Sequence, residues 1–192
     1  MSSASLQLWN SIRAVSLDQI EAAHGSVGGS GRGRRYATQQ INQAYTVLLS
    51  SQFQGFCRDL HSECVTILLQ GIPSVPLRTV LNGMVLTGRK LDSGNPNPGN
   101  IGVDFGGFGF RFWDAVYAIS VINRARKAHL DALNDWRNAV AHQDFTAPRL
   151  GGATVVQLVT VRRWRAACNG LATAFDAVMQ DRLRTLIGTS PW

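Results

Sequence analysis

Arg137 and His142 lie five positions apart in the segment Arg137-Asn138-Ala139-Val140-Ala141-His142. Cleavage of RNA by its own 2′-hydroxyl needs a base for the hydroxyl proton, an acid for the leaving 5′-oxygen, and cations that stabilise the phosphorane. An imidazole titrates near pH ~6.5 and can act as acid or base. A guanidinium stays positively charged. These two residue types therefore suit phosphodiester transfer without a metal ion.

Helical spacing separates these two side chains. At ~100° per residue, positions 137 and 142 point roughly 140° apart on an α-helix. Both can face one atom only if the helix end unwinds, if the arginine reaches round the helix, or if two copies of the chain meet across a two-fold axis. Residue types alone leave another reading open, in which Arg137 is a surface residue and His142 a helix-end cation favoured by the helix dipole.

The chain is strongly basic. It has 192 residues and a formal net charge of +7, and all of its 19 basic residues except Lys90 and Lys127 are arginine. Arginine pairs bidentately with phosphate and stacks on bases, although an arginine-rich proteome would give the same bias. We therefore expect a polyanionic partner, with nucleic acid as the first candidate.

Composition indicates one globular domain. Hydrophobic residues make up 45% of the chain and charged residues 16%. Cys57, Cys64 and Cys168 form no C-x-x-C pair, so we expect core residues in a reducing compartment. The start of the chain lacks a basic signal region, and no apolar run approaches the ~18 residues of a membrane span. We expect a cytoplasmic protein that contacts no membrane.

The first 35 residues are predicted to form an arm and a tether in front of the main bundle, which spans residues 36–192. Residues 5–24 have a weak helical pattern, with a capping-box match at Ser16-Leu17-Asp18-Gln19. Residues 24–35 are rich in glycine and arginine. This tether is either a loop that grasps phosphate or a solvated linker.

The remaining sequence predicts an all-α bundle of four or more helices. Apolar residues recur every three or four positions from Tyr36 to Gln70, which indicates one long helix. Residues 91–109 are rich in glycine, proline and asparagine and are predicted to be a long loop. Residues 154–159 are expected to be extended, and Thr160 to cap the last helix. Further helices are predicted over residues 76–87, 110–118 and 122–142.

The segment from Arg137 to His142 resembles the Arg-x4-6-His motif of the HEPN superfamily, whose common form has Asn or Asp directly after the arginine, as Asn138 is here. The long helix around Phe53-Gln54-Gly55-Phe56 and the loop that follows Arg89-Lys90 resemble the HEPN-like branch associated with RiboL-PSP domains. The resemblance covers about residues 40 to 187.

Membership would imply a HEPN-like four-helix bundle, here with extra N-terminal helices and a long loop before the motif helix. It would also imply a homodimer whose motifs face a basic cleft, and a metal-independent endoribonuclease that needs no cofactor. Such proteins act as toxins in toxin–antitoxin or antiphage defence systems, so a cognate antitoxin is a possible partner. Arg137 and His142 are then catalytic and Asn138 a polar support, with Asp135 and Asp144 as secondary candidates.

RNA contacts are expected from five basic residues, namely Arg32, Arg34, Arg35, Arg89 and Lys90. In HEPN toxins paired with a nucleotidyltransferase antitoxin, a tyrosine often lies two residues after the histidine. This chain has Asp144 there, which argues against silencing through such a tyrosine. The alternative function is a non-catalytic HEPN module that binds RNA or a nucleotide, or that serves as a dimerisation adaptor.

Two weaker signals are set aside. The scattered histidines do not have the spacing of a zinc site. Gly106-Gly107-Phe108-Gly109 lacks the strand, turn and lysine of a phosphate-binding loop. The aromatic residues around it could stack on bases, but core or dimer contacts are the preferred interpretation.

Overall fold

All regular structure in the described part of the chain, residues 1–28 and 35–192 of a computed structural model, is helical. The predicted all-α class is therefore confirmed for these residues. The long elements are α2 (Ala14–Gly28), α3 (Arg35–Gln70), α8 (Ile122–His142) and α9 (Leu158–Ile187). The shorter ones are α1 (Ala4–Leu8), the π-helical turn η1 (Trp9–Arg13), α4 (Val75–Leu86), α5 (Lys90–Ser93), α6 (Pro98–Gly106), α7 (Phe112–Ile119) and the 3₁₀ turn η2 (Pro148–Leu150).

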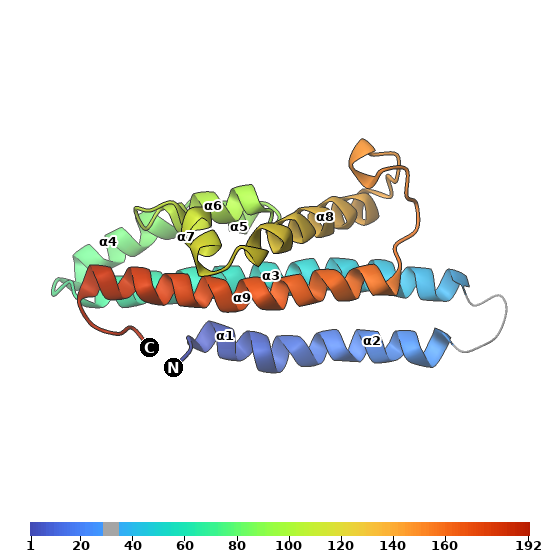
Figure 1. The fold of residues 1–192 in the computed structure, drawn as a ribbon. Coiled ribbons are helices and arrows are strands. Elements are labelled where there is room, and N and C mark those ends of the chain that lie inside the picture. The colour runs from blue at the N-terminus through green and yellow to red at the C-terminus, as the bar shows by residue number, and fades with distance from the viewer. Residues whose placement is uncertain (29–34) are drawn as a thin grey trace.

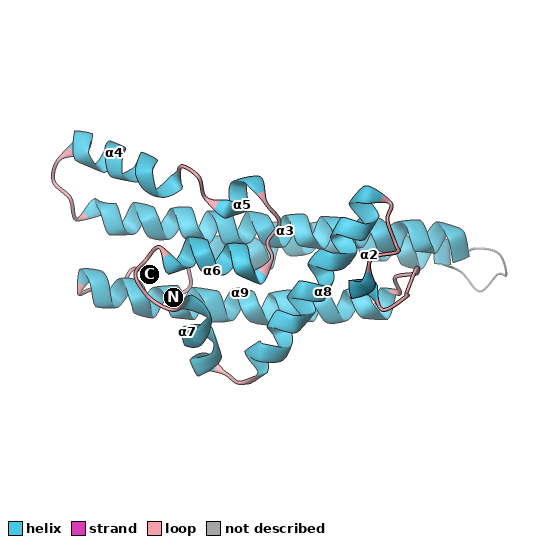
Figure 2. Cartoon of the chain, turned by 90° about the horizontal axis from the view of Figure 1, so that it is seen from above, coloured by secondary structure: helices cyan, strands magenta, loops and turns pink. Residues whose placement is uncertain are grey.

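The two longest helices, α3 and α9, lie side by side and run in the same direction (Figures 1 and 2). In the view of Figure 1, α1 and α2 lie below this pair, and α5 to α8 lie above it. Both α2 and α8 run opposite to α3 and α9. The motif helix α8 therefore packs on a platform that two long helices form.

Phe175 of α9 lies at the centre of the core. Its ring contacts those of Phe53, Phe105, Phe112 and Trp113, at centroid distances of 4.9 to 6.1 Å. These rings come from α3, α6 and α7, so one aromatic cluster joins the platform to the short helices above it. Phe105 and Phe112 are buried here, which agrees with the prediction that the aromatic residues of this segment make core contacts.

The N-terminal helices pack against the bundle as part of its core. Trp9 is only 2% exposed and contacts Phe53 and Phe56 of α3. Further along, the Tyr45 hydroxyl donates a hydrogen bond of 2.9 Å to Glu21, and burial raises the pKa of Tyr45 to about 12. Residues 4–28 are therefore held to α3 by both apolar and polar contacts.

Two predictions for this region are wrong. The capping-box match at Ser16 does not start a helix, because Ser16 lies inside α2 and its hydroxyl donates to the Ile12 carbonyl. Residues 24–28 of the predicted tether belong to α2. Residues 29–34, which include Arg32 and Arg34, lie outside the described residues, so the two interpretations of the tether both remain open.

The stretch 91–109, predicted to be a loop, contains most of α5 and all of α6. Asn97 caps α6, since its side-chain oxygen accepts from the backbone N–H of Asn100, and Pro98 occupies the first helical turn. The Asp104 carboxylate accepts from the N–H groups of Lys90 and Leu91 and so caps α5. The abundance of proline and asparagine here marks helix starts rather than an open loop.

The other helix predictions agree well with the structure. The long helix predicted from residue 36 to residue 70 is α3, and the helix predicted over residues 122–142 is α8. The segment 154–159 forms no strand within the described residues, and α9 begins at Leu158, before the predicted cap at Thr160. All three cysteines are buried and free. Across the described residues, no helix is long and apolar enough to cross a membrane.

Candidate functional site

The motif helix α8 keeps its regular form up to His142. Gln143 then turns the chain with φ 52° and ψ 32°, and its N–H donates to the Val140 carbonyl. The next N–H, from Asp144, donates to the Ala139 carbonyl. The helix end is therefore closed by a left-handed cap, and it does not unwind to bring Arg137 towards His142.

Asn134 fixes the position of α8 on the rest of the bundle. Its side-chain nitrogen donates to the Pro96 carbonyl at 3.1 Å, and its oxygen accepts from the Ser50 hydroxyl at 3.3 Å. Asn134 is only 3% exposed, so these bonds form away from water. They join the motif helix to α3 and to the connection between α5 and α6. A buried polar group that loses its hydrogen-bond partner lowers the free energy of unfolding by about 1–3 kcal/mol.

Arg137 is half-buried and bonds to its neighbour in the motif. Its Nη1 atom donates to the side-chain oxygen of Asn138 at 3.2 Å, and the same oxygen accepts from Asn95 Nδ2 at 2.5 Å. Asn95 lies in the connection between α5 and α6. The Asn138 side-chain oxygen thus accepts hydrogen bonds from both Arg137 and Asn95.

His142 lies in a different environment. It is exposed and lines a cavity of about 350 Å³ together with Asp135, Asn138, Ala139, Asp144, Ala147 and Arg149. Arg137 does not contribute to this cavity as far as the described residues define it. Within one copy of the chain, the structure therefore brings Asn138 to His142 but does not bring the two charged residues of the motif together.

The loop after α8 supplies the other polar groups of the His142 cavity. Asp144 accepts hydrogen bonds from the hydroxyl and the N–H of Thr146, at 2.6 and 3.0 Å. These bonds, and more weakly the nearby His142, hold the pKa of the Asp144 carboxyl below its usual range. Asp144 therefore stays a carboxylate beside His142 at neutral pH.

Arg149 is a cavity residue that the sequence did not indicate. Its Nη1 atom lies 3.3 Å from Asp135, so η2 folds back along α8 and places a guanidinium near His142. The side chain of Arg149 is 77% exposed, so the ion pair leaves it open to solvent. Only the path of the loop places Arg149 here, and the residue types in the loop do not predict that path.

Of the five predicted RNA-contacting residues, the structure describes the side chains of Arg89 and Lys90. Arg35 begins α3, but its side chain, like all of Arg32 and Arg34, is outside the described part. Arg89 has a side chain only 8% exposed, and its guanidinium donates to Asp92, to the Arg58 carbonyl and to Ser62. These contacts favour a structural role for Arg89. Lys90 is exposed on α5, and neither it nor Arg89 lines the His142 cavity.

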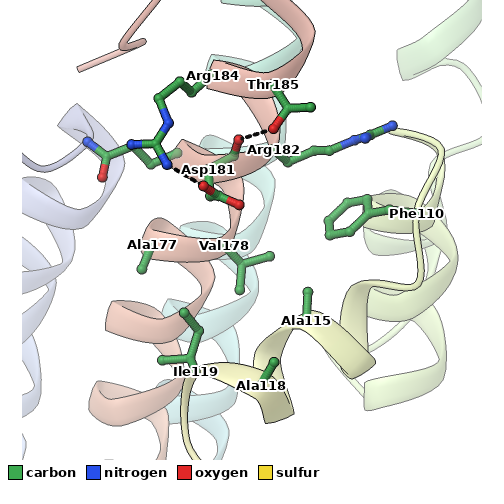
Figure 3. Close-up of a pocket in the computed structure, with 11 residues that line it drawn as sticks. Phe110, Ala115, Ala118, Ile119, Ala177, Val178, Asp181, Arg182, Arg184 and Thr185 are labelled. Atoms are coloured by element: carbon green, nitrogen blue, oxygen red, sulfur yellow. Dashed lines mark hydrogen bonds and ion pairs between the residues drawn. The ribbon is translucent and has the colours of Figure 1, made fainter.

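Another cavity lies between α7 and α9 near the end of α9, away from the motif (Figure 3). It measures about 560 Å³ and has an apolar floor that includes Ile119 and Val178. Figure 3 shows Arg184 paired with Asp181 at its rim, and Arg182 beside the ring of Phe110. Arg182 also donates to the carbonyls of Phe108 and Gly109. Both arginines of this cavity thus have protein partners.

The described residues contain no cluster of three or more His, Cys, Asp or Glu side chains that could hold a metal ion. Comparison of the chain with protein-family models, with curated proteins and with solved structures gives no match.

Proposed function

We propose that this chain is a metal-independent endoribonuclease that acts as a homodimer, and that it serves as a toxin in a toxin–antitoxin or antiphage defence system. One observation supports the dimer in particular. His142 is exposed in a cavity to which Arg137 of the same copy does not contribute, although the helix that carries both is regular. A second copy across a two-fold axis would supply Arg137, which the same copy does not bring to His142.

In the proposed reaction, His142 of one copy takes the proton from the 2′-hydroxyl of the RNA. The 2′-oxygen then attacks the adjacent phosphorus, and the bond from phosphorus to the 5′-oxygen breaks. The same His142, now protonated, gives its proton to that leaving oxygen, and Arg137 of the second copy stabilises the charge on the phosphorane. The products are a 2′,3′-cyclic phosphate and a free 5′-hydroxyl. Asn138 holds Arg137 in place through its side-chain oxygen.

Purified protein tests this proposal directly. Single-stranded RNA should be cleaved in EDTA, with 2′,3′-cyclic phosphate ends. Arg137→Ala and His142→Ala should each abolish cleavage, while circular dichroism shows an unchanged helical fold. A matched control is Arg111→Ala, on an exposed surface outside the motif, which should cleave like wild type. A His142→Ala variant that cleaves as fast as wild type would refute the mechanism.

One observation favours the alternative, a non-catalytic module that binds RNA or a nucleotide, or that mediates dimerisation. The Arg137 guanidinium is already bonded to Asn138 and stays clear of His142 in the single copy. Such a module would bind RNA with an affinity that falls steeply with salt, and it would show no turnover. Expression in a bacterial host separates the two, since growth arrest relieved by Arg137→Ala favours the toxin. A cognate antitoxin would then restore growth.

A further inference from the structure

A third cavity forms a groove between the first half of α8 and the first half of α9. It has a volume of about 330 Å³ and is lined by Ile122, Ala125, Arg126, His129, Arg163, Ala166 and Ala167. Among these lining residues, the ionisable side chains are two arginines and one histidine. The described residues place no carboxylate in its wall. The groove is therefore a concave surface whose formal charge is entirely positive.

Small residues make room for Arg126 in this groove. A Cβ atom added to Gly170 would lie only 2.3 Å from the Arg126 guanidinium, so this guanidinium rests directly on the backbone of α9. Arg126 Nη1 donates at 2.9 Å to the side-chain oxygen of Asn123. Asn123 is fully buried and donates in turn to the Val116 carbonyl. The neutral amide of Asn123, which its bond to Val116 holds in place, therefore orients Arg126 without neutralising its charge.

Arg163 and His129, the other two ionisable residues of the groove, have no partner among the described residues. Arg163 and His129 are exposed, and neither forms a hydrogen bond or an ion pair with any residue in 1–28 or 35–192. The neighbouring arginines on α9 differ from Arg163 in this respect. Arg162 pairs with Glu21 at 2.7 Å, and Arg165 pairs with Asp18 at 2.6 Å.

The carboxylates of the two groove helices are all engaged elsewhere. On α8, Asp131 pairs with Lys127, and Asp135 pairs with Arg149. On α9, Asp176 accepts from the Ser3 N–H, and Asp181 pairs with Arg184. No carboxylate of α8 or α9 is therefore left to neutralise the groove.

We propose that this groove binds a phosphate group, carried either by the backbone of an RNA strand or by a free nucleotide, through Arg126, His129 and Arg163. Two guanidinium groups can offer paired N–H donors to phosphate oxygens, and such charge-assisted bonds are short and strong. The described lining contains no Phe, Tyr or Trp ring on which a base could stack. We therefore expect the groove to bind the phosphate group without recognising the base.

This groove is distinct from the His142 cavity. His129 and His142 are 13 positions apart, which is about 20 Å along α8 at ~1.5 Å per residue, and their side chains point roughly 140° apart. The proposal does not depend on ribonuclease activity. RNA binding can be measured in a His142→Ala background, which cannot cleave RNA under the proposed mechanism, and phosphate and AMP are not substrates of a ribonuclease.

The test compares Arg163→Gln and His129→Gln with a control, Arg78→Gln. Arg78 on α4 also lacks an ion pair with any described residue, so its variant removes the same charge elsewhere. Three probes are used: inorganic phosphate, AMP and a fluorescein-labelled oligouridine. Binding of phosphate and AMP is followed by the NMR signals of the His129 ring, or by backbone amide signals for the His129→Gln variant, and RNA binding by fluorescence anisotropy.

Arg163→Gln should weaken binding about tenfold, as expected for the loss of a charge-assisted contact. The salt dependence of RNA affinity, as a log–log slope, should become shallower by about 0.7. If Arg163→Gln weakens the binding of RNA alone, the ligand of the groove is an RNA strand. If it also weakens the binding of AMP and phosphate, the ligand is a free nucleotide. The proposal is overturned if Arg163→Gln binds all three probes like the background protein, or if Arg78→Gln weakens binding equally.

Discussion

Asn95 and Asn138 are joined by a hydrogen bond of 2.5 Å between their side-chain amides, which ties the α5–α6 connection to the motif helix. The Asn138 oxygen that accepts this bond also accepts from Arg137. Asn95 therefore helps to fix the orientation of a proposed catalytic arginine from outside the motif.

We expect Asn95→Ala to lower the cleavage rate by about tenfold to a hundredfold, because Asn138 and Arg137 would lose a fixed position. The fall should appear in kcat, with KM unchanged, since Asn95 acts on Arg137 and not on the bound RNA. Asn82→Ala on α4 is the matched control and should cleave like wild type. An Asn95→Ala variant with the wild-type kcat would rule out this positioning role.

The aromatic cluster around Phe175 gives a stability prediction. Phe175 is fully buried and contacts rings from α3, α6 and α7. Replacing it with alanine should lower the free energy of unfolding by about 3–5 kcal/mol, measured by urea denaturation. Phe175→Leu keeps more of the volume and should cost less. A loss below about 1 kcal/mol for the alanine variant would show that Phe175 is not at the centre of the core.

His61 predicts how stability changes with pH. It is 2% exposed, and burial, followed by the nearby Arg89, lowers the pKa of its imidazole. The unfolded chain therefore binds this proton at a higher pH than the folded chain does. As pH falls below the unfolded value of ~6.5, the free energy of unfolding should decrease, down to the lowered pKa of the folded state.

The measurement is urea denaturation between about pH 5 and pH 7.5. His61→Phe fills the same space between Phe105 and Phe108 without a titrating group, so its stability should depend less steeply on pH over this range. His129→Gln, which changes an exposed histidine, is the matched control. Equal slopes for wild type and His61→Phe would contradict the prediction.

The long helices could be predicted from sequence because their apolar residues repeat every three or four positions. This pattern located α3 and α8 to within one residue at each end. α5 and α6 were missed because their caps depend on contacts between segments, such as the Asp104 carboxylate that accepts from Lys90 and Leu91. Local residue types around Asn97 and Pro98 favoured a turn as much as a helix start.

The candidate site could be predicted only in part, for a similar reason. The angle between Arg137 and His142 follows from helix geometry alone, and the regular α8 preserves it. The surroundings of each residue depend on distant parts of the chain: Asn95 reaches the motif from the α5–α6 connection, and Arg149 folds back from η2. Arg89 looked free in the sequence, but it is bonded to residues of α3 and α5.

Mixing two inactive variants tests whether Arg137 of one copy acts with His142 of another. Arg137→Ala and His142→Ala protein would be unfolded, combined in equal amounts and refolded, and RNA cleavage measured. About half of the resulting dimers contain one copy of each variant, and each of these has one intact Arg137–His142 pair across the interface. We predict recovery of about a quarter of wild-type activity. A mixture as inactive as either variant alone would contradict the account.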